Sequence, residues 1–196
     1  GSNNIDDPTS LYRRRPTGLD PINPFYDNLY TERIDRRQNV ISTLYSKVQL
    51  PFGIEYNLNF SPYYDWSEYY NHHSSQGENW TAIGGTSTRR HNKRFSWQFD
   101  NILRWSKEFN KIHRVDVTFL ANAENAKTWS TTANASNYSP NDLLGYHALQ
   151  SGSVVTVISD DTHQSGDALM GRIFYSLKNR YMITTSIRRD GYSAFG

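Results

Sequence analysis

The sequence predicts an all-β fold whose antiparallel strands run up and down, and three observations lead to it. Apolar residues recur at every second position in about six segments, which is the period of a strand. The segments are joined alternately by short and by long connections, as in outer-membrane barrels with tight periplasmic turns and long extracellular loops. No segment approaches the roughly 20 apolar residues of a membrane helix. The alternation of short and long connections favours a section of a transmembrane β-barrel.

Composition is compatible with such a barrel but does not require it. Only 36% of the residues are hydrophobic, yet a barrel strand needs only about 9–11 residues with alternate positions apolar. The 14 Tyr, 9 Phe and 5 Trp suit aromatic girdles at two membrane interfaces and equally suit carbohydrate-binding sandwiches. A soluble antiparallel sandwich, with the apolar side chains in a core, therefore stays open on pattern and composition.

Charge and cysteine content exclude some classes of function. The net charge is +2 and the basic residues are scattered among acidic and aromatic ones, so we expect no nucleic-acid partner. The chain has no cysteine, which removes disulfides and thiolate metal sites and is compatible with passage through an oxidising periplasm.

The first part of the chain predicts an irregular segment followed by a hairpin. Residues 1–39 hold four of the seven prolines and two arginine runs without sustained periodicity, so we expect an irregular segment on the extracellular side. Strands are predicted near residues 40–50 and 54–64, with Pro51-Phe52-Gly53 as the turn between them.

The middle of the chain predicts a long loop and a second hairpin. Residues 65–94 are rich in Tyr, Trp, His, Ser and Gly and are expected to form a long extracellular loop. Alternation returns in strands near 94–107 and 113–125, which a tight connection at Asn110-Lys111 joins.

The last part predicts another long loop and a third hairpin. Residues 127–165 are expected to form an extracellular excursion, with a short helix over Leu143–Leu149 and a strand over Val154–Ile158. Strands near 168–177 and 181–190 then flank a turn at residues 178–180.

Parity along each strand predicts which side chains meet lipid and which face a wet lumen. The side chains expected to meet lipid are Ile54, Tyr56, Leu58, Phe60, Trp97, Phe99, Val115, Val117, Phe119, Ile183 and Ile187. The side chains expected to point inward are Glu55, Asn57, Asn59, Gln98, Asp100, Arg104, Asp116, Glu124, Arg172 and Arg188. About six strands cannot close around a wide lumen, and unpaired edges are not tolerated in lipid, so we expect a section of a larger barrel.

A set of spaced residues near the C-terminus resembles a known barrel signature. The set comprises Gly171, Arg172, Tyr175, Arg180, Tyr181, Arg188, Asp190, Gly191, Ser193, Phe195 and Gly196. It resembles the signature of SusC/RagA-type TonB-dependent outer-membrane transporters, in which an Arg-x-Asp-Gly-Ser-Ser-x-Phe-Gly element follows a Gly-Arg-x-x-Tyr strand. Tyr192 departs from the pattern where a serine is usual.

The resemblance implies a fold and a function for the complete protein. The barrel would be of the 22-stranded type with a plugged lumen, in contact with outer-membrane lipid and lipopolysaccharide of a Bacteroidetes-type bacterium. It would import a large nutrient, such as a glycan, oligosaccharide or peptide, together with a SusD-like surface lipoprotein. TonB would act through the plug domain, which we expect to be absent from this chain. The alternative is a soluble extracellular carbohydrate-binding β-sandwich module.

Several groups of residues bear on the question of chemical sites. His72-His73 with His91 suggests a metal site, but adjacent side chains on an extended chain diverge. Asp160-Asp161 lacks the spacing of a calcium loop. Paired carboxylates of a glycosidase and a nucleophile elbow are not recognisable. We therefore expect no enzyme, no catalytic residue, no metal and no cofactor.

Three aromatic residues of the first long loop are candidates for contact with a ligand or with the lipoprotein lid: Tyr69, Tyr70 and Trp80. Tyr and Trp rings stack on sugar rings or peptide side chains at low entropic cost. The alternative for these residues is packing between loops. Tyr63, Tyr64 and Trp66 are expected instead in an aromatic girdle at the membrane interface.

Overall fold

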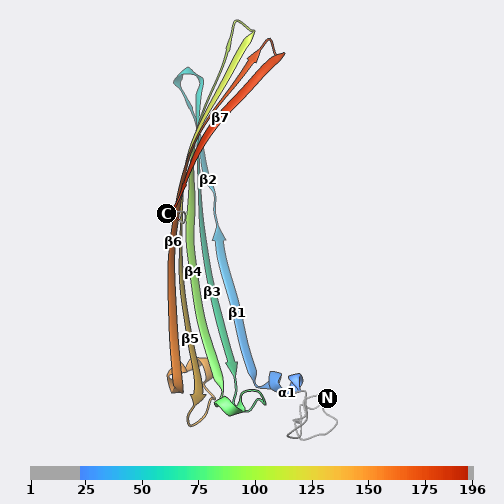
Figure 1. Ribbon diagram of the computed structural model, residues 1–196, viewed down its shortest axis with the longest axis vertical. Coiled ribbons are helices and arrows are strands. Elements are labelled where there is room, and N and C mark those ends of the chain that lie inside the picture. Colours follow the sequence, from blue (N-terminus) through green and yellow to red (C-terminus); the bar gives the residue numbers. More distant parts are fainter. Residues whose placement is uncertain (1–22, 194–196) are drawn as a thin grey trace. The chain divides into compact units, whose positions relative to one another are not determined.

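The computed structural model describes residues 23–193, and in this range the chain forms one antiparallel sheet of seven strands (Figure 1). Its order is β1-β3-β4-β5-β6-β7, with β2 also paired to β3. Because consecutive long strands are neighbours, the sheet is an up-and-down meander, as predicted. The strands are β1 (Thr31–Ile41), β2 (Leu44–Leu50), β3 (Ile54–His73), β4 (Thr86–Phe109), β5 (His113–Tyr138), β6 (Gly152–Leu177) and β7 (Tyr181–Tyr192).

The expected tight turns are present between β2 and β3, β4 and β5, and β6 and β7. Phe52 and Gly53 have φ of 66° and 77°, in a 3₁₀ turn over Pro51–Gly53. The other two turns each place two consecutive residues in the left-handed region: Asn110-Lys111 and Lys178-Asn179. Two such residues in a row match the right-handed twist of the flanking strands, so these turns close hairpins without splaying them.

The prediction of an irregular segment over 1–39 is wrong for residues 24–39; residues 1–22 lie outside the described residues. Pro24–Leu29 forms helix α1, whose N-cap Asn23 accepts a 3.1 Å hydrogen bond from the Phe25 amide. Thr31–Ile41 forms β1, so the strand expected at 40–50 is split between β1 and β2. The sequence of β1 is charged on both parities, so it lacks alternation. It is a strand because it pairs with β3.

Residues 65–94 and 127–165 are mostly strand rather than loop. The actual connections are residues 74–85 and 139–151, because the flanking strands continue well beyond the predicted ends. Hydrogen bonds between polar side chains of neighbouring strands replace the apolar pattern here, including Thr88 to Asn134 at 2.8 Å and Ser130 to Asn92 at 2.8 Å. A strand that is polar on both faces cannot be recognised from period-two hydropathy.

The helix predicted over Leu143–Leu149 is also wrong. Two 3₁₀ turns occupy this region, Gly145–His147 and Leu149–Ser151, and Gly145 has φ of +47°. A left-handed residue interrupts a right-handed helix. Val154–Ile158 is extended as expected, but as part of the long β6. No helix among residues 23–193 is long and apolar enough to cross a membrane.

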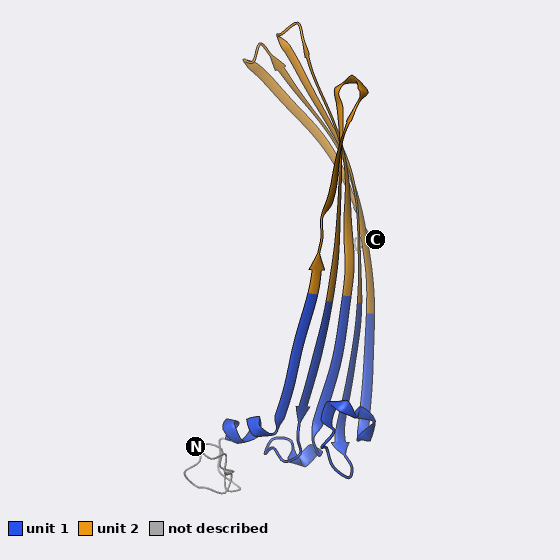
Figure 2. Cartoon of the chain, turned by 180° about the vertical axis from the view of Figure 1, so that it is seen from behind, with its two compact units in different colours: residues 1–38, 66–93, 129–160 blue, residues 39–65, 94–128, 161–196 orange. Residues whose placement is uncertain are grey.

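The chain divides into two compact units (Figure 2). Unit 1 comprises residues 1–38, 66–93 and 129–160, and unit 2 comprises residues 39–65, 94–128 and 161–196. Within the described residues, unit 1 contains α1 and the connections 74–85 and 139–151, whereas unit 2 contains the three tight turns.

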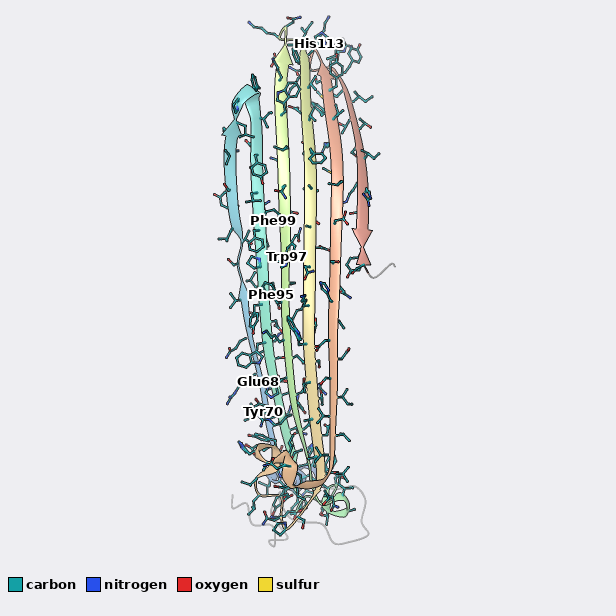
Figure 3. The ribbon with its side chains drawn as sticks, turned by 90° about the vertical axis from the view of Figure 1, so that its left-hand side faces the viewer. Glu68, Tyr70, Phe95, Trp97, Phe99 and His113 are labelled. Carbon is teal, nitrogen blue, oxygen red and sulfur yellow. The ribbon has the colours of Figure 1, made fainter. Side chains whose placement is uncertain are left out.

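Unit 2 has one apolar and one polar face. Strand register places Leu44 opposite Phe60 and Tyr175 opposite Ile183. The Phe60 ring meets the Phe99 ring edge-on, with centroids 6.0 Å apart, and Phe95, Trp97 and Phe99 follow one another at alternate positions of β4 (Figure 3). This apolar face is open to its surroundings, since Ile183 is 65% and Ile187 79% exposed.

The opposite face of unit 2 is held by polar contacts. Lys47 lies 2.7 Å from the Glu55 carboxylate, which also accepts a 3.0 Å hydrogen bond from Gln49. Asp100 accepts hydrogen bonds from Asn122 and from Gln98. These pairs lie at the positions of the predicted inward parity, so Lys47, Glu55 and Asp100 are partnered by neighbours on their own face.

Candidate functional site

Tyr69 lies on β3 between two guanidinium groups of unit 1. Arg33 of β1 is over the Tyr69 ring at 5.2 Å from its centroid, and Arg90 of β4 is at 5.6 Å. β1 and β4 flank β3 in the sheet, so the two cations reach the ring from neighbouring strands on either side. Cations within about 6 Å of an aromatic centroid are attracted by the ring quadrupole. The Tyr69 ring therefore positions two arginines.

Tyr70 points to the other face of β3, since successive side chains of a strand alternate. Its ring stacks on Tyr146 with centroids 5.4 Å apart and planes inclined by 16°. His91 meets the Tyr70 ring edge-on at 5.5 Å, and Arg89 lies over it at 4.9 Å (Figure 3 labels Tyr70 and its neighbour Glu68). Tyr70 thus anchors the 139–151 connection, which carries Tyr146.

Trp80 belongs to the 74–85 connection and stacks on His73, with ring centroids 4.3 Å apart and planes inclined by 17°. The His73 ring also lies 3.0 Å from the Thr31 hydroxyl and 2.8 Å from the Asn71 amide. Burial lowers the pKa of His73 below its usual value of 6.5, with a smaller contribution from His72. The neutral imidazole is therefore favoured at this position.

The three aromatic candidates do not converge on one cavity. Tyr69 and Tyr70 lie on opposite faces of β3, and Trp80 covers His73. The packing alternative therefore accounts for the contacts of Tyr70 and Trp80. Their role in ligand or lid contact stays a prediction, and Tyr69 differs from both because its ring contacts two cations.

The 139–151 connection is fastened to the sheet through Asp142 and His72. The Asp142 carboxylate accepts a 2.5 Å hydrogen bond from the Ser75 amide and lies 3.9 Å from Nε2 of His72. Nδ1 of His72 is 2.8 Å from the Ser87 hydroxyl. Burial acts to raise the pKa of Asp142, but hydrogen bonds from Ser75 and Ser74 outweigh it and hold the pKa below its usual range.

The three histidines of the suggested metal site each contact different residues. His72 contacts Ser87 and Asp142, His73 contacts Trp80, and His91 lies 4.0 Å from Glu68. Within residues 23–193, no three His, Cys, Asp or Glu side chains are grouped closely enough to hold a metal ion.

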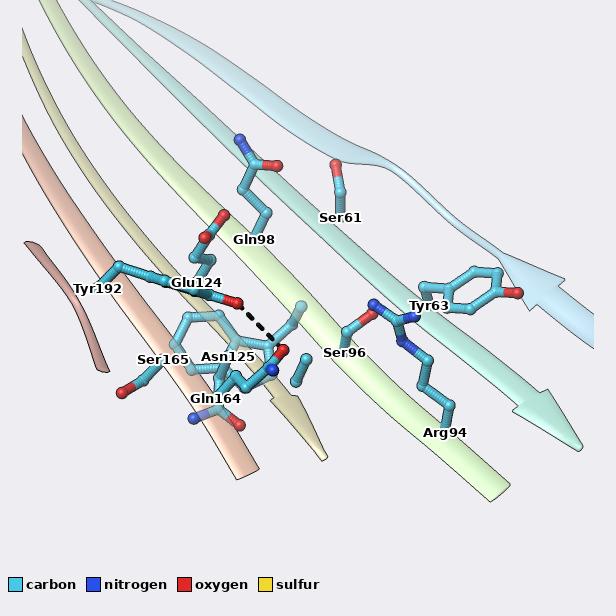
Figure 4. Close-up of a pocket in the computed structure, with 12 residues that line it drawn as sticks. Ser61, Tyr63, Arg94, Ser96, Gln98, Glu124, Asn125, Gln164, Ser165 and Tyr192 are labelled. Carbon is cyan, nitrogen blue, oxygen red and sulfur yellow. Dashed lines mark hydrogen bonds between the residues drawn. The ribbon is translucent and has the colours of Figure 1, made fainter. Parts of the chain in front are cut away.

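Unit 2 has a hollow of about 310 Å³ on its polar face (Figure 4). Its lining includes Ser61, Tyr63, Arg94, Gln98, Glu124 and Tyr192. The Tyr192 hydroxyl donates a 3.0 Å hydrogen bond to Gln164 (Figure 4). Gln98 and Glu124 were expected on this side, whereas Tyr63 was expected in the aromatic girdle. Tyr63 has the same parity as Ser61 on β3, so both side chains lie on the polar face. Tyr64 and Trp66 have the opposite parity, so alternation alone distinguishes them from Tyr63.

The described residues of the C-terminal signature lie on β6, on the turn after it, on β7 and at Ser193, directly after β7. Gly171 lies opposite Ile187 and Tyr175 opposite Ile183. Arg188 pairs with Asp190 at 2.7 Å along β7, and a Cβ on Gly191 would lie 2.6 Å from the Asp167 carboxylate. The Ser193 hydroxyl accepts a 2.9 Å hydrogen bond from the Ser165 amide. The paired positions and the Ser165–Ser193 hydrogen bond join β6 to the end of β7, whereas the Arg188–Asp190 pair lies within β7. Phe195 and Gly196 lie outside the described residues.

Sequence comparisons relate the chain to TonB-dependent receptors. No family model matches the chain. It is 32% identical over 109 residues to TonB-dependent receptor P39 of Formosa agariphila and 27% identical over 140 residues to TonB-dependent receptor P26 of the same organism. These matches cover 55% and 69% of this chain but only 10% and 14% of the two relatives.

Solved structures match the fold over almost the whole chain. The RagAB peptide transporter superposes with a TM-score of 0.79 at 11% identity, covering 93% of this chain and 20% of that one. The RagAB peptide importer in its open-open state superposes with a TM-score of 0.75, covering 91% of this chain and 20% of that one. At this identity the match concerns the fold alone. The sequence and fold matches together agree with the expectation of a non-enzymatic chain. The chain is a section of the β-barrel of a TonB-dependent receptor, a family of the bacterial outer membrane, and its fold matches a section of the RagA-type barrel.

Proposed function

We propose that the receptor containing this section imports a large nutrient, a glycan, oligosaccharide or peptide, across the outer membrane. The observation that carries the proposal is the division of unit 2 into an open apolar face and a polar face with a hollow. An apolar face suits contact with lipid, and a polar face suits a wet lumen. A transport path requires both surfaces on one sheet.

The soluble sandwich alternative is not supported by the sheet. A sandwich packs two sheets with the apolar residues between them, whereas the described residues form one sheet. Leu44, Phe119 and Ile187, which would belong to a sandwich core, are 62%, 45% and 79% exposed. In the barrel of a receptor, the same side chains would be covered by lipid acyl chains.

We further propose that a SusD-like surface lipoprotein caps the receptor, that TonB drives release of the substrate, and that unit 1 lies on the extracellular side. RagAB is a peptide transporter, and its likeness to this chain is a likeness of fold. Unit 1 carries the longer connections 74–85 and 139–151, which is the pattern of external loops. The tight turns of unit 2 would then face the periplasm.

The proposal is tested in cells that produce the complete receptor. Outer membranes are prepared, and an antibody against residues 74–85 detects the protein in boiled and unboiled samples with and without detergent. We expect a heat-modifiable, detergent-requiring band several times heavier than 22.7 kDa. Uptake of labelled oligosaccharides and peptides is then compared in strains with and without TonB. A soluble band of this chain's own mass, or uptake that is the same without TonB, would overturn the proposal.

A further inference from the structure

We infer that Arg33 and Arg90, held beside the Tyr69 ring by neighbouring strands, bind carboxylates of an acidic oligosaccharide during its import. This inference rests on the proposed function and names a substrate class for it. The observation behind it is an aromatic ring of unit 1 that two cations from neighbouring strands contact, at centroid distances of 5.2 and 5.6 Å.

The two guanidinium groups keep most of their donors available. Arginine carries five N–H donors in a planar fork. Nε of Arg90 donates to the Thr132 hydroxyl at 3.3 Å, and Arg33 lies 3.8 Å from Asp35 with both side chains more than 60% exposed. An ion pair of such length and exposure contributes little. Among the described residues, Arg90 has no carboxylate partner within 4.0 Å.

Repulsion between two exposed like charges beside one ring is screened by solvent, so it costs only a little free energy. Tyr69 offsets part of that cost, because its ring attracts both cations and fixes their positions. Contact with a ring face leaves the in-plane N–H groups of arginine directed outward, where they match the two oxygens of a carboxylate. The cluster is therefore organised before a ligand binds, which lowers the entropic cost of binding.

The surrounding side chains favour a sugar over a peptide. Tyr69 and Arg90 lie among hydrogen-bonding groups, namely Ser67, Thr88, Asn92, Ser130, Thr132 and Asn134, which pair with one another across the strands. Peptide grooves combine hydrogen bonds with apolar pockets for alternate side chains. Hydroxyl and amide groups suit the hydroxyls of a sugar, so an oligosaccharide with uronate carboxylates fits this surface better than an acidic peptide.

The chain supplies a matched control beside the site. Arg89 precedes Arg90 on β4 and its guanidinium lies over Tyr70, on the opposite face of β3. Replacing either arginine with glutamine removes the same charge from the same strand. An effect of net charge alone would therefore appear in both variants, whereas an effect of the proposed site would appear only for Arg90.

The experiment uses the complete receptor in lipid nanodiscs and isothermal titration calorimetry. The probes are trigalacturonate, its methyl ester, which is the same sugar without charge, and triglutamate. The proteins are the wild type, Arg90→Gln, its matched control Arg89→Gln, and the double variant Arg33→Gln/Arg90→Gln. We expect trigalacturonate to bind the wild type better than its ester and to lose about tenfold in Kd in the double variant, as two partly exposed ion pairs imply.

The remaining outcomes decide the inference. Arg89→Gln should bind trigalacturonate as the wild type does, and the difference between acid and ester should shrink as salt is added. Equal binding of acid and ester, equal losses in the Arg89→Gln and Arg90→Gln variants, or selective binding of triglutamate would each overturn it. If the receptor still takes up neutral oligosaccharides in a TonB-dependent way, the proposed function stands although the inference fails. If the protein is absent from the outer membrane, both the proposed function and the inference fail.

Discussion

The hydroxyl of Tyr146 donates a 2.8 Å hydrogen bond to the carboxylate of Glu32, which lies 114 residues earlier in the chain. Tyr146 is buried, at 4% exposure, and its ring stacks on Tyr70. The hydrogen bond to Glu32, together with burial, raises the pKa of Tyr146 above its usual value. One side chain of the 139–151 connection thus contacts both β1 and β3 of unit 1.

Replacing Tyr146 with Phe should loosen the 139–151 connection while leaving the barrel section folded. The substitution removes one hydrogen bond to a carboxylate, on the order of 1 kcal/mol, and keeps the stacked ring. Limited proteolysis and hydrogen exchange of residues 139–151 measure the change. Tyr146→Ala, which also removes the ring, should open the connection further. Equal protection in the wild type and both variants would contradict this role.

Replacing Gly145 with Ala should be strongly destabilising for unit 1. A Cβ at this position would lie 2.7 Å from Cγ of His72, and Gly145 has φ of +47°. Strain and overpacking together cost about 1–3 kcal/mol. Gly171→Ala is the matched control, since its Cβ would meet nothing closer than 3.8 Å. The measurement is the thermal unfolding of each variant, monitored through the hydrogen-exchange protection of residues 139–151. A Gly145→Ala protein as stable as Gly171→Ala would refute the packing argument.

Acid should open the 74–85 connection through His73. Burial lowers the pKa of His73 from 6.5, so the folded state favours the neutral ring more than the unfolded state does. The resulting stabilisation is present above pH 6.5 and is lost as the pH falls through the lowered value. Hydrogen exchange of residues 74–85 should therefore rise below about pH 6.5. In His73→Gln the rise over this range should be absent; an unchanged pH profile would count against His73.

A second acid transition should involve Asp142. Hydrogen bonds lower its pKa below 3.8, so its contribution is complete above that value and is lost at a more acid pH. Exchange of residues 139–151 should accelerate only in this lower range, separately from that of residues 74–85. In Asp142→Asn the connection should already be loosened at pH 7, because the amide replaces an oxygen acceptor with a donor. A single shared transition for both connections would disprove the separation.

A charge on the apolar face of unit 2 should impair insertion of the barrel. Ile187→Arg places a guanidinium on the face of Ile183, at a cost of about 2–4 kcal/mol near the middle of a bilayer. Thr184→Arg, on the opposite parity of β7, is the control and should be tolerated. The measurement is the heat-modifiable fraction of receptor in outer membranes and its urea midpoint in lipid vesicles. If Thr184→Arg were the more damaging variant, the assignment of faces would be reversed.

The hairpins of unit 2 were predictable from the sequence because one of their faces is apolar. The segment from Ile54 to Phe60 alternates strictly, and the structure pairs it with Leu44–Leu50 in the register that alternation requires. The turns were recognisable from their residues, since Pro-Phe-Gly and Lys-Asn-Arg interrupt the alternation. The C-terminal signature was recognised as a pattern, but its contacts, such as Arg188 with Asp190, became visible only in the structure.

Unit 1 was largely unpredictable from the sequence, as its polar strands show. Thr31–Ile41 and residues 65–73 carry charged and aromatic residues on both parities, so no hydropathy period marks them as strands. The sequence identifies Tyr69, Tyr70 and Trp80 as aromatic candidates, but it does not show that they lie on different surfaces. The placement of Arg33 and Arg90 at the Tyr69 ring could not be predicted from the sequence, because the two arginines are far apart in the chain.

The sequence by itself therefore determined the fold class, the hairpins of unit 2 and the parity of their faces, because burial of one face imposes a period of two on neighbouring residues. Only the tertiary structure decided the full length of the strands, the attachment of the 139–151 connection to the sheet and the placement of Arg33 and Arg90 at the Tyr69 ring. These features depend on pairing between residues remote in sequence, such as Glu32 and Tyr146, and such pairing leaves no local periodic pattern.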